Sequence, residues 1–236
     1  MKLKHTNTVC PYCRQIMNRI PDHPLSRSRE HLVPNTLLQK TRTNGDFEFW
    51  ACKGCNSDKS NLDFILGTVA KSQSECVDLA VNAFIKAVDY RGSQERFLDM
   101  IRSGKKMPDG SIALKIPVSG LEMAKYCTYL GQGAYFLKNG IPMSKSMHIV
   151  LFEVFNSHVA KELEHRYRQQ WGTNAYRDLE QNSYTRVFAP GEAIMWMRNG
   201  QVMFVFHDRF VLILRIVRRT KANLIKLDQC SYEFYR

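Results

Sequence analysis

The sequence predicts an α+β protein in two parts. Three observations support this prediction. Two CxxC pairs lie within the first 55 residues, apolar residues recur at helical spacing beyond residue 71, and alternating apolar segments beyond residue 147 are typical of strands. The patterns place a boundary near residue 70, so that residues 1–70 form one unit and residues 71–236 form an α+β part with an antiparallel meander.

The composition is that of a globular protein with a basic surplus. The chain has 236 residues, of which 44% are apolar and 24% charged, so it can bury a sizeable core. The net charge is +12 and the isoelectric point is about 9.5. Such a surplus attracts polyanions, of which nucleic acid is the commonest and an anionic membrane surface the runner-up. The charge alone does not decide between them.

The first residues, MKLKHTNTVC, have no apolar stretch of the kind found in signal peptides. No apolar run in the sequence approaches the length of a membrane span. We therefore expect a cytoplasmic protein that does not use a membrane as its partner. In a reducing cytosol disulfides are disfavoured, and paired cysteines indicate metal ligands or redox centres.

The first part reads as a loop, two short strands and a helix. Residues 1–30 are rich in Pro, Ser and Arg, and a short extended segment follows at His31–Val33. Asn44–Gly45 is a strong turn signal, and Phe47–Ala51 alternates as a strand does. A helix is predicted to begin near Gly54. Its buried face would carry Ile65, Leu66 and Val69.

The second part begins with helices and turns to strands. Helical spacing is seen in 77–88, in Phe97–Ile101, in the glycine-interrupted Leu121–Leu137 and in Val159–Trp171. Asn199–Gly200 reads as a two-residue hairpin turn. The predicted strands are His148–Phe155, Glu192–Met197, Val202–Phe206, Phe210–Val217 and Leu224–Leu227. A basic cluster at Arg215–Lys221 could follow a DNA backbone, although a solvated strand end is the simpler interpretation.

The two cysteine pairs form the strongest signal in the chain. They are Cys10-x2-Cys13 and Cys52-x2-Cys55, separated by 38 residues. Two thiolates at this spacing can point at one metal, and two such pairs complete a tetrahedral Zn²⁺ shell. A redox motif would explain one pair but not the other. The sequence therefore predicts a structural zinc site held by all four cysteines.

The residues around the cysteines resemble a nuclease motif. Glu30–His31 lies between the pairs on a predicted strand, Pro34 follows three residues later, and Asn56 comes directly after the last cysteine. A knuckle, an acidic residue followed by His, a second strand, a second knuckle and a helix opening with Asn resemble the HNH, or ββα-metal, endonucleases. The similarity is to the four-cysteine subgroup, and it covers residues 10 to about 67.

The resemblance implies a role for each matching residue. His31 aligns with the general base, Glu30 with a ligand of a catalytic divalent cation, and Asn56 with the position that completes that metal site. Mg²⁺ or Mn²⁺ would be the catalytic ion. The family's middle asparagine has only Asn44 as a counterpart, or a backbone carbonyl takes its place. Lys59 would contact phosphate or remain a solvated helix charge.

The resemblance thus predicts an endonuclease that hydrolyses phosphodiester bonds in DNA, with double-stranded DNA as the expected substrate. Two alternatives stay open. One is a non-catalytic, zinc-stabilised module that binds nucleic acid, and the other is an interaction domain with a zinc staple. Only the nuclease needs an acid, a base and an oxygen ligand at Glu30, His31 and Asn56. Sequence preference, nicking against double-strand cutting, oligomeric state and biological setting are not indicated.

Overall fold

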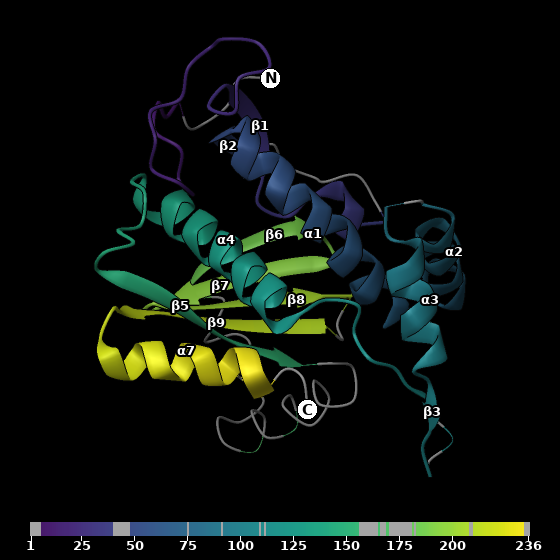
Figure 1. Cartoon of the computed structure of the whole chain (residues 1–236). Helices are drawn as coiled ribbons and strands as arrows, with labels where there is room; N and C mark the ends of the chain where they lie inside the picture. Colours follow the sequence, from purple (N-terminus) through teal and green to yellow (C-terminus); the bar gives the residue numbers. More distant parts are fainter. Residues whose placement is uncertain are drawn as a thin grey trace.

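A computed structural model gives the fold of the chain (Figure 1). It describes residues 6–39, 48–74, 76–90, 92–108, 110, 112–155, 165, 169, 181, 183–207 and 210–233. Within these residues the protein is a mixed α+β structure with an antiparallel meander, as the sequence predicts. No helix among them is both long enough and apolar enough to cross a membrane.

The first part is a short hairpin followed by a long helix. Strands β1 (Arg27–His31) and β2 (Glu48–Cys52) pair in antiparallel register, with His31 opposite Glu48 and Arg27 opposite Cys52. Helix α1 (Lys53–Ser72) starts at the residue after β2, and the short 3-10 helix η1 (Asn35–Leu37) lies between the strands in the sequence. The predicted turn at Asn44–Gly45 lies outside the described residues.

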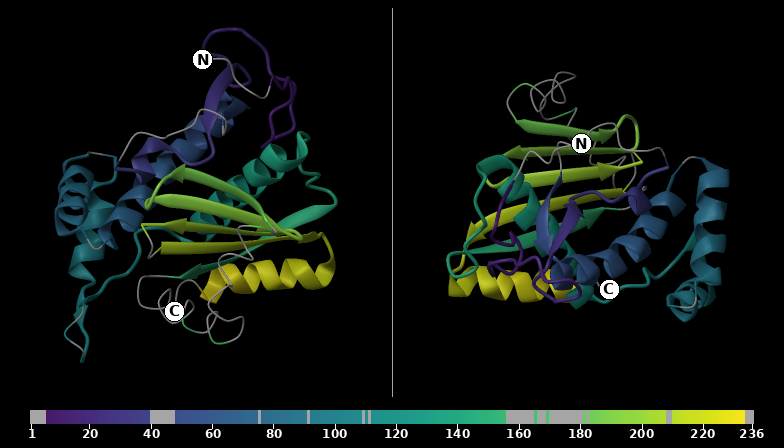
Figure 2. Two further views of the ribbon diagram at one scale, coloured as in Figure 1. Left: turned by 180° about the vertical axis from the view of Figure 1, so that it is seen from behind. Right: turned by 90° about the horizontal axis from the view of Figure 1, so that it is seen from above.

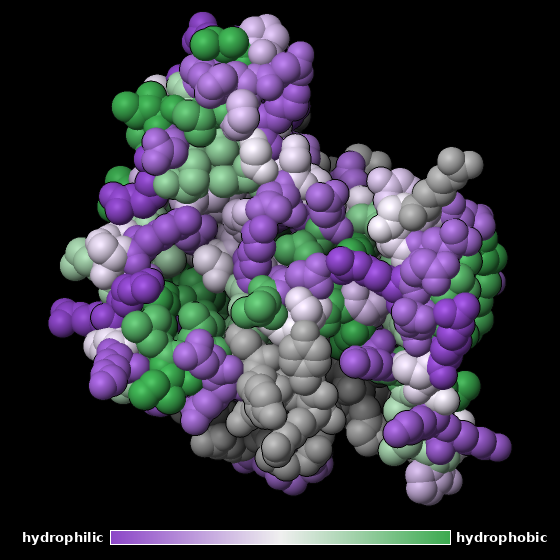
Figure 3. Space-filling view, in the orientation of Figure 1, coloured by the Kyte–Doolittle hydropathy of each residue, from purple (hydrophilic) through white to green (hydrophobic). Residues whose placement is uncertain are grey.

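Two further helices and a small ribbon follow. They are α2 (Val77–Asp89), α3 (Gln94–Arg102) and the two-residue strands β3 (Lys105–Lys106) and β4 (Ile112–Ala113). The apolar spacing of α2 was correctly helical, but Val77, Val81 and Ile85 are at least half exposed. Apolar surface is visible at the right edge of the molecule in Figure 3. The buried face of α2 instead carries Ala83 and Ala87.

The second part is built on a five-stranded sheet. Strands β6 (Tyr184–Ala189), β7 (Ala193–Arg198), β8 (Gln201–Phe206) and β9 (Phe210–Arg218) form the meander. Strand β5 (His148–Phe155) pairs with β9, so the spatial order is β5-β9-β8-β7-β6. The turn between β7 and β8 has Asn199 and Gly200 at positive φ, as a type I′ hairpin requires.

Two helices pack against this sheet (Figure 2). Helix α4 (Gly120–Asn139) begins with a capping box, in which Ser119 Oγ accepts from the Glu122 amide and Glu122 accepts from the Ser119 amide. It ends at Gly140, whose φ of 73° suits glycine. Helix α7 (Lys221–Glu233) lies along β5 and α4.

The prediction of a strand at Leu224–Leu227 is wrong, because this segment is part of α7. Leu224, Leu227 and Cys230 are partly buried at intervals of three residues, which is a helical spacing, whereas Ile225 is half exposed. The Thr220 hydroxyl accepts from the Asn223 amide at 3.2 Å and caps the helix start. Strand β6 was not anticipated, and the helix predicted at Val159–Trp171 falls outside the described residues, apart from His165 and Gln169.

The hairpin unit and the sheet share one continuous core. Helix α4 joins them, because the ring of Tyr12 meets that of Tyr129 at 4.9 Å and the ring of Phe49 meets that of Phe136 at 5.2 Å. At Gly133 the helix approaches the hairpin so closely that a Cβ would lie 2.4 Å from Leu32 Cδ1. The boundary near residue 70 stays a prediction, and it falls inside α1.

Hydrogen bonds also connect η1 and the residues after it to the sheet. The Gln39 amide donates to Glu192 Oε2 at 2.6 Å, and His207 Nε2 donates to the Leu37 carbonyl at 2.8 Å. Both sheet residues are buried. These contacts hold the segment after β1 on the end of the meander.

Candidate functional site

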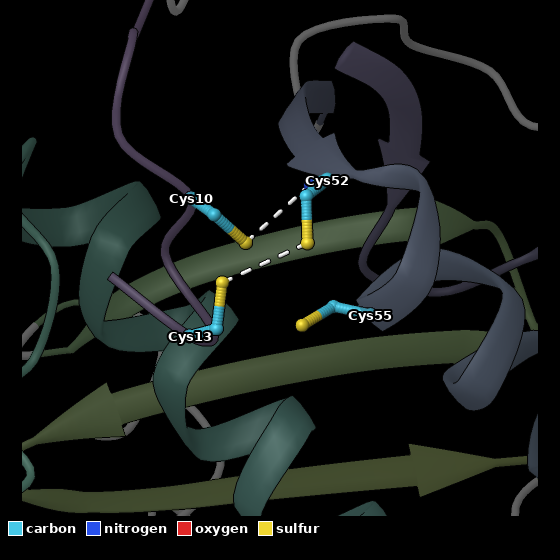
Figure 4. Close-up of side chains that lie close together, drawn as sticks. All are labelled: Cys10, Cys13, Cys52 and Cys55. Atoms are coloured by element: carbon cyan, nitrogen blue, oxygen red, sulfur yellow. Dashed lines mark hydrogen bonds between the residues drawn. The ribbon is translucent and has the colours of Figure 1, made fainter. Parts of the chain in front are cut away.

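The four predicted cysteines come together from two local structures. Cys10 and Cys13 lie in a tight turn, in which the Arg14 amide donates to the Cys10 carbonyl at 2.9 Å and Arg14 takes a φ of 67°. Cys52 ends β2 and precedes α1, and Cys55 lies in the first turn of that helix. The turn and the strand–helix junction therefore present two thiols each to the same point (Figure 4).

The geometry of the cluster fits a tetrahedral metal. The four Sγ atoms lie within 4.8 Å of one another, and Cys13 Sγ is 3.7 Å from Cys52 Sγ. Tetrahedral Zn–S bonds of about 2.3 Å would place the sulfurs about 3.8 Å apart. Four soft thiolate donors are a set that zinc prefers. The cysteines can therefore hold a metal such as zinc.

The electrostatics favour at least one thiolate before any metal binds. The pKa of Cys10 is lowered to about 5, chiefly because Cys55 donates a hydrogen bond to it, while burial opposes the shift. Backbone amides add to the lowering, among them the Cys52 amide, which lies 3.4 Å from Cys10 Sγ. The pKa of Cys52 is raised to about 11 by burial and by the neighbouring Cys10 charge. The lowered pKa of one thiol and the raised pKa of its neighbour show that the thiols cannot all ionise together without a cation. A divalent cation would stabilise four thiolates and so favour deprotonation of all four thiols.

The predicted base, His31, lies at the end of β1 beside a carboxylate. Its Nδ1 is 2.8 Å from Glu48 Oε1, and 30% of its side chain is exposed. The Glu48 side chain is only 7% exposed, and its other oxygen accepts from Arg29 Nε at 2.6 Å. Nδ1 and the carboxylate lie within ion-pair distance, although their angle is not that of a hydrogen bond, and Nε2 is the ring nitrogen on the side away from Glu48. Glu48 thus stands where an orienting group for His31 is needed.

Glu30, the predicted metal ligand, lies in a separate buried cluster. Adjacent strand residues face opposite sides, so its carboxylate points away from the His31 ring and toward α1. Its Oε1 lies 3.0 Å from Lys59 Nζ and accepts from the Tyr12 hydroxyl at 3.0 Å. Lys59 Nζ also donates to both oxygens of Asp63, at 3.0 and 2.9 Å. Glu30 is 1% exposed and Lys59 is fully buried.

Burial dominates the ionisation of this cluster. It raises the pKa of Glu30, an effect opposed by the Lys59 charge and reinforced by Asp63. Burial likewise raises the pKa of Asp63, again against Lys59. For Lys59 burial acts to lower the pKa, but attraction to Asp63 and Glu30 outweighs it, and the pKa is raised. The ammonium is therefore charged and fixed between two carboxyl groups.

Asn56 joins the start of α1 to β1. Its Nδ2 donates to Ser28 Oγ at 2.6 Å and to the Arg29 carbonyl at 3.1 Å. Lys59 Nζ makes a parallel connection one turn later, to the His31 carbonyl at 3.2 Å. The helix thus holds the backbone of β1 on both sides of Glu30, and through it the position of His31.

The structure brings the predicted residues together only in part. The four cysteines converge, and Asn56 lies against β1, but Glu30 and His31 face opposite sides of that strand. The expected contact of Lys59 with phosphate does not fit the structure, because its ammonium is inaccessible and surrounded by protein oxygens. The expected cation site at Glu30 does not fit either, because Lys59 already places a positive charge 3.0 Å from that carboxylate.

Glu48 is the residue that the sequence interpretation missed. It lies on the strand that was predicted at Phe47–Ala51, where it alternates with apolar residues. The sequence did offer one signal, because Glu48 is an acidic residue on the second predicted strand and His31 lies on the first. Only the register, with His31 opposite Glu48, turns that signal into a contact. Comparisons of the chain with protein-family models, curated proteins and solved structures find no match.

Proposed function

We propose that the hairpin unit is an HNH-type nuclease site that hydrolyses phosphodiester bonds in DNA, with His31 as general base and Glu48 as the residue that positions it. The contact of 2.8 Å between His31 Nδ1 and the buried Glu48 carboxylate carries this proposal. The order of the elements supports it, because a tight turn, the end of a hairpin and the start of a helix bring the four cysteines together in the order that the resemblance implies.

The chemistry follows from the His31 environment. A water molecule near Nε2 would lose a proton to the imidazole, and the oxygen would attack the phosphorus as hydroxide. The resulting imidazolium would be stabilised by Glu48, whose side chain is almost fully shielded from water. The bond to the leaving oxygen then breaks, and that oxygen takes up a proton from solvent.

The charge of the chain supports an anionic substrate. The net charge is +12, and Arg27 and Arg29 lie on the His31 face of β1. Guanidinium groups bind phosphate oxygens well because their N–H donors match the geometry of the anion. Arg29 is partly engaged by Glu48, so the donors that Glu48 does not use are the ones available to substrate.

The requirement for Mg²⁺ or Mn²⁺ stays an expectation from the resemblance. Among the described residues, the four cysteines are the only group of three or more His, Cys, Asp or Glu side chains positioned to share a metal. Glu30 does not fit the role of ligand while Lys59 neutralises it. Nicking with and without added Mg²⁺ or Mn²⁺ tests this requirement.

The engagement of Glu30 by Lys59 favours a second candidate, a zinc-stabilised module that binds nucleic acid without cleaving it. In that case His31 and Glu48 would serve only to stabilise the hairpin surface. Both candidates predict DNA binding that weakens with salt. They differ in cleavage alone.

Nicking of supercoiled plasmid by the full-length protein decides between the two. The assay is run with Mg²⁺, Mn²⁺ and no added cation. We expect His31→Ala to lower the rate about a hundredfold or more, because proton abstraction is lost. Glu48→Gln should reduce it less, since the base remains. His165→Ala, which changes an exposed histidine in the second part, is the matched control and should nick at the wild-type rate. Equal rates for wild type and His31→Ala would sink the nuclease assignment.

A further variant separates the two roles considered for Glu30. Glu30→Gln removes a charge from the buried cluster while keeping its size. If Glu30 acts only through Lys59, the variant should lose stability, and raised Mn²⁺ should restore no activity. Rescue by Mn²⁺ at unchanged stability would instead indicate a metal ligand. Thermal melting and nicking, measured on the same preparation, distinguish these results.

A further inference from the structure

A groove lies between the loop that leads into β1 and strand β2. Its volume is about 360 Å³, within the range that small ligands occupy. One side is formed by loop residues and the other by the hairpin. The lining residues are Arg19, Ile20, Pro21, Ser26, Arg27 and Trp50.

The groove combines a flat apolar wall with positive charge. Trp50 offers an indole ring, Ile20 and Pro21 offer apolar surface, and none of the six lining residues is acidic. The nearby Asp22 is already paired with Lys53 at 2.5 Å. A planar ring with an anionic group attached is complementary to such a surface.

Arg27 has a hydrogen-bond donor that nothing in the described structure uses. Its Nε is shielded from solvent and has no acceptor. A buried donor without an acceptor is costly, and most are paired. An anion held by the Arg27 guanidinium would supply acceptor oxygens after a small movement of the side chain. This unused donor points to a ligand that carries phosphate or a similar group.

Trp50 is held in place by its backbone. The Asn7 side chain accepts from the Trp50 amide at 3.1 Å and donates to the Trp50 carbonyl at 2.8 Å, so it occupies the outer edge of β2. Trp50 lies opposite Arg29 in the hairpin, and opposite residues of an antiparallel pair share a face. The Trp50 backbone is therefore held at the edge of β2, and its indole lies on the same face as His31.

Strand β1 connects the groove to His31. Arg27, Arg29 and His31 alternate along β1 and share a face. Arg27 and His31 are four residues apart, which is roughly 13 Å along a strand. That separation corresponds to a few nucleotides of an extended DNA strand. A strand entering the groove would continue toward the imidazole.

We propose that this groove binds one unpaired nucleotide of a DNA strand. The base stacks on Trp50 against Ile20 and Pro21, and the phosphate is held by Arg19 and Arg27. The idea rests on the proposed nuclease function, which it deepens by naming the substrate as DNA with a single-stranded or extruded base near the cleaved bond. A duplex with every base paired does not offer a ring to the indole.

Binding by the cleavage-deficient full-length His31→Ala protein tests this assignment. Fluorescence anisotropy compares a labelled strand of twelve thymidines with a duplex of the same length, without added divalent cation. We expect Trp50→Ala to weaken single-strand binding about ten- to hundredfold and duplex binding much less. Trp50→Phe should retain most of the affinity. Arg27→Gln should reduce the dependence of binding on salt by about one phosphate contact.

The matched control is Arg102→Gln, which removes an exposed arginine from α3 and should leave binding unchanged. Unaltered zinc content and melting temperature show that each variant is folded. If Trp50→Ala does not fold, the quenching of tryptophan fluorescence by the single strand replaces it. Quenching should disappear in Trp50→Phe while affinity persists, and undiminished quenching would overturn the proposal.

Two other results also overturn it. One is single-strand affinity that Trp50→Ala and Arg27→Gln leave intact, and the other is an equal loss for single strand and duplex. Because cleavage is not the readout, the result is separate from that of the nicking assay. Groove binding without wild-type nicking would refute only the nuclease, and nicking without groove binding would refute only the nucleotide site.

Discussion

The hairpin of β1 and β2 and the meander of β6–β9 are both antiparallel, yet they are stabilised in different ways. The hairpin has two strands of five residues and hides a glutamate, a lysine and an aspartate between itself and α1. The sheet has five strands and an almost wholly apolar inner face, with Val202, Phe204 and Leu212 completely buried.

The difference shows what a small unit needs in order to hold a site. An isolated two-stranded hairpin is at best marginally stable in water. The unit compensates with a cysteine cluster, a charged contact in its interior and the packing of α4. The sheet also packs against α4, but its inner face is apolar and it has neither a cysteine cluster nor an ion pair of this kind among its described buried residues. We therefore expect the two regions to respond differently to the same kind of substitution.

The largest contrast should come from a cysteine ligand. Cys52→Ser removes one of the four thiols, and structural zinc sites contribute about 10–16 kcal/mol in small zinc-binding domains. We expect zinc content to fall and the amides of β1 and β2 to lose protection from hydrogen exchange, while β8 and β9 keep theirs. Cys76→Ser, at an exposed cysteine outside the cluster, is the control. Protected hairpin amides in a zinc-free Cys52→Ser protein would contradict the role given to the metal.

The next contrast concerns the buried lysine. Lys59→Met leaves Glu30 and Asp63 facing each other without a cation, and breaking a buried ion pair typically costs about 3–5 kcal/mol. Urea denaturation should show this loss. Adding Glu30→Gln and Asp63→Asn to Lys59→Met removes the orphaned charges and should restore much of the stability. A single variant as stable as wild type would show that the ion cluster adds nothing.

The same cluster should respond to pH. The pKa values of Glu30 and Asp63 are raised in the folded protein, mainly by burial, so the folded state binds more protons than the unfolded state as pH falls toward their ordinary values. Their contribution to the free energy of unfolding therefore rises as pH falls from neutrality toward the ordinary carboxyl pKa of about 4. The gain should be largest in Lys59→Met, where nothing opposes protonation. Denaturation of Lys59→Met and of the triple variant across a pH series from neutrality to about 4 measures the gain, and parallel behaviour of the two would contradict it.

The smallest effect should come from an ion pair on the sheet. Arg215 Nη2 lies 2.6 Å from Glu153 Oε1, and both side chains are about half exposed. Exposed pairs contribute about 0–1 kcal/mol. We expect Arg215→Gln to shift the urea midpoint little, and less still at high salt. A loss comparable to that of Lys59→Met would mean that burial does not explain the difference between the regions.

Much of the fold could be predicted, because the spacing of apolar residues and the residue types of turns are local properties of the sequence. Strand β5 was predicted at its observed bounds, and the predicted segments for β7, β8 and β9 differ from the observed ones by a residue or less at each end. The segment of α7 could not be assigned from the three apolar residues of Leu224–Leu227, since its helical spacing emerges only when Cys230 is included. The packing of α4 on the hairpin depends on distant residues such as Gly133 and Leu32, and no local pattern reveals it.

The candidate site was predictable only as far as sequence spacing reaches. The CxxC pairs specify their cluster because two thiols three residues apart converge without further information. The contact of Glu48 with His31 depends on strand register, which neither residue specifies on its own. Lys59 and Asp63 have the spacing of an exposed helical ion pair, and only the packing of α1 on β1 reveals them as buried.

The junction at Cys52 has a consequence for how this unit tolerates change. Strand β2 ends at Cys52 and α1 starts at Lys53, so no loop residue separates the two elements. One residue inserted there would turn the whole helix by about 100°. That single step would carry Cys55, Asn56 and Lys59 away from their partners together. A substitution at this point would disturb one contact, whereas an insertion would disturb all of these contacts at once. The spacing between strand and helix is therefore the quantity that the unit must preserve.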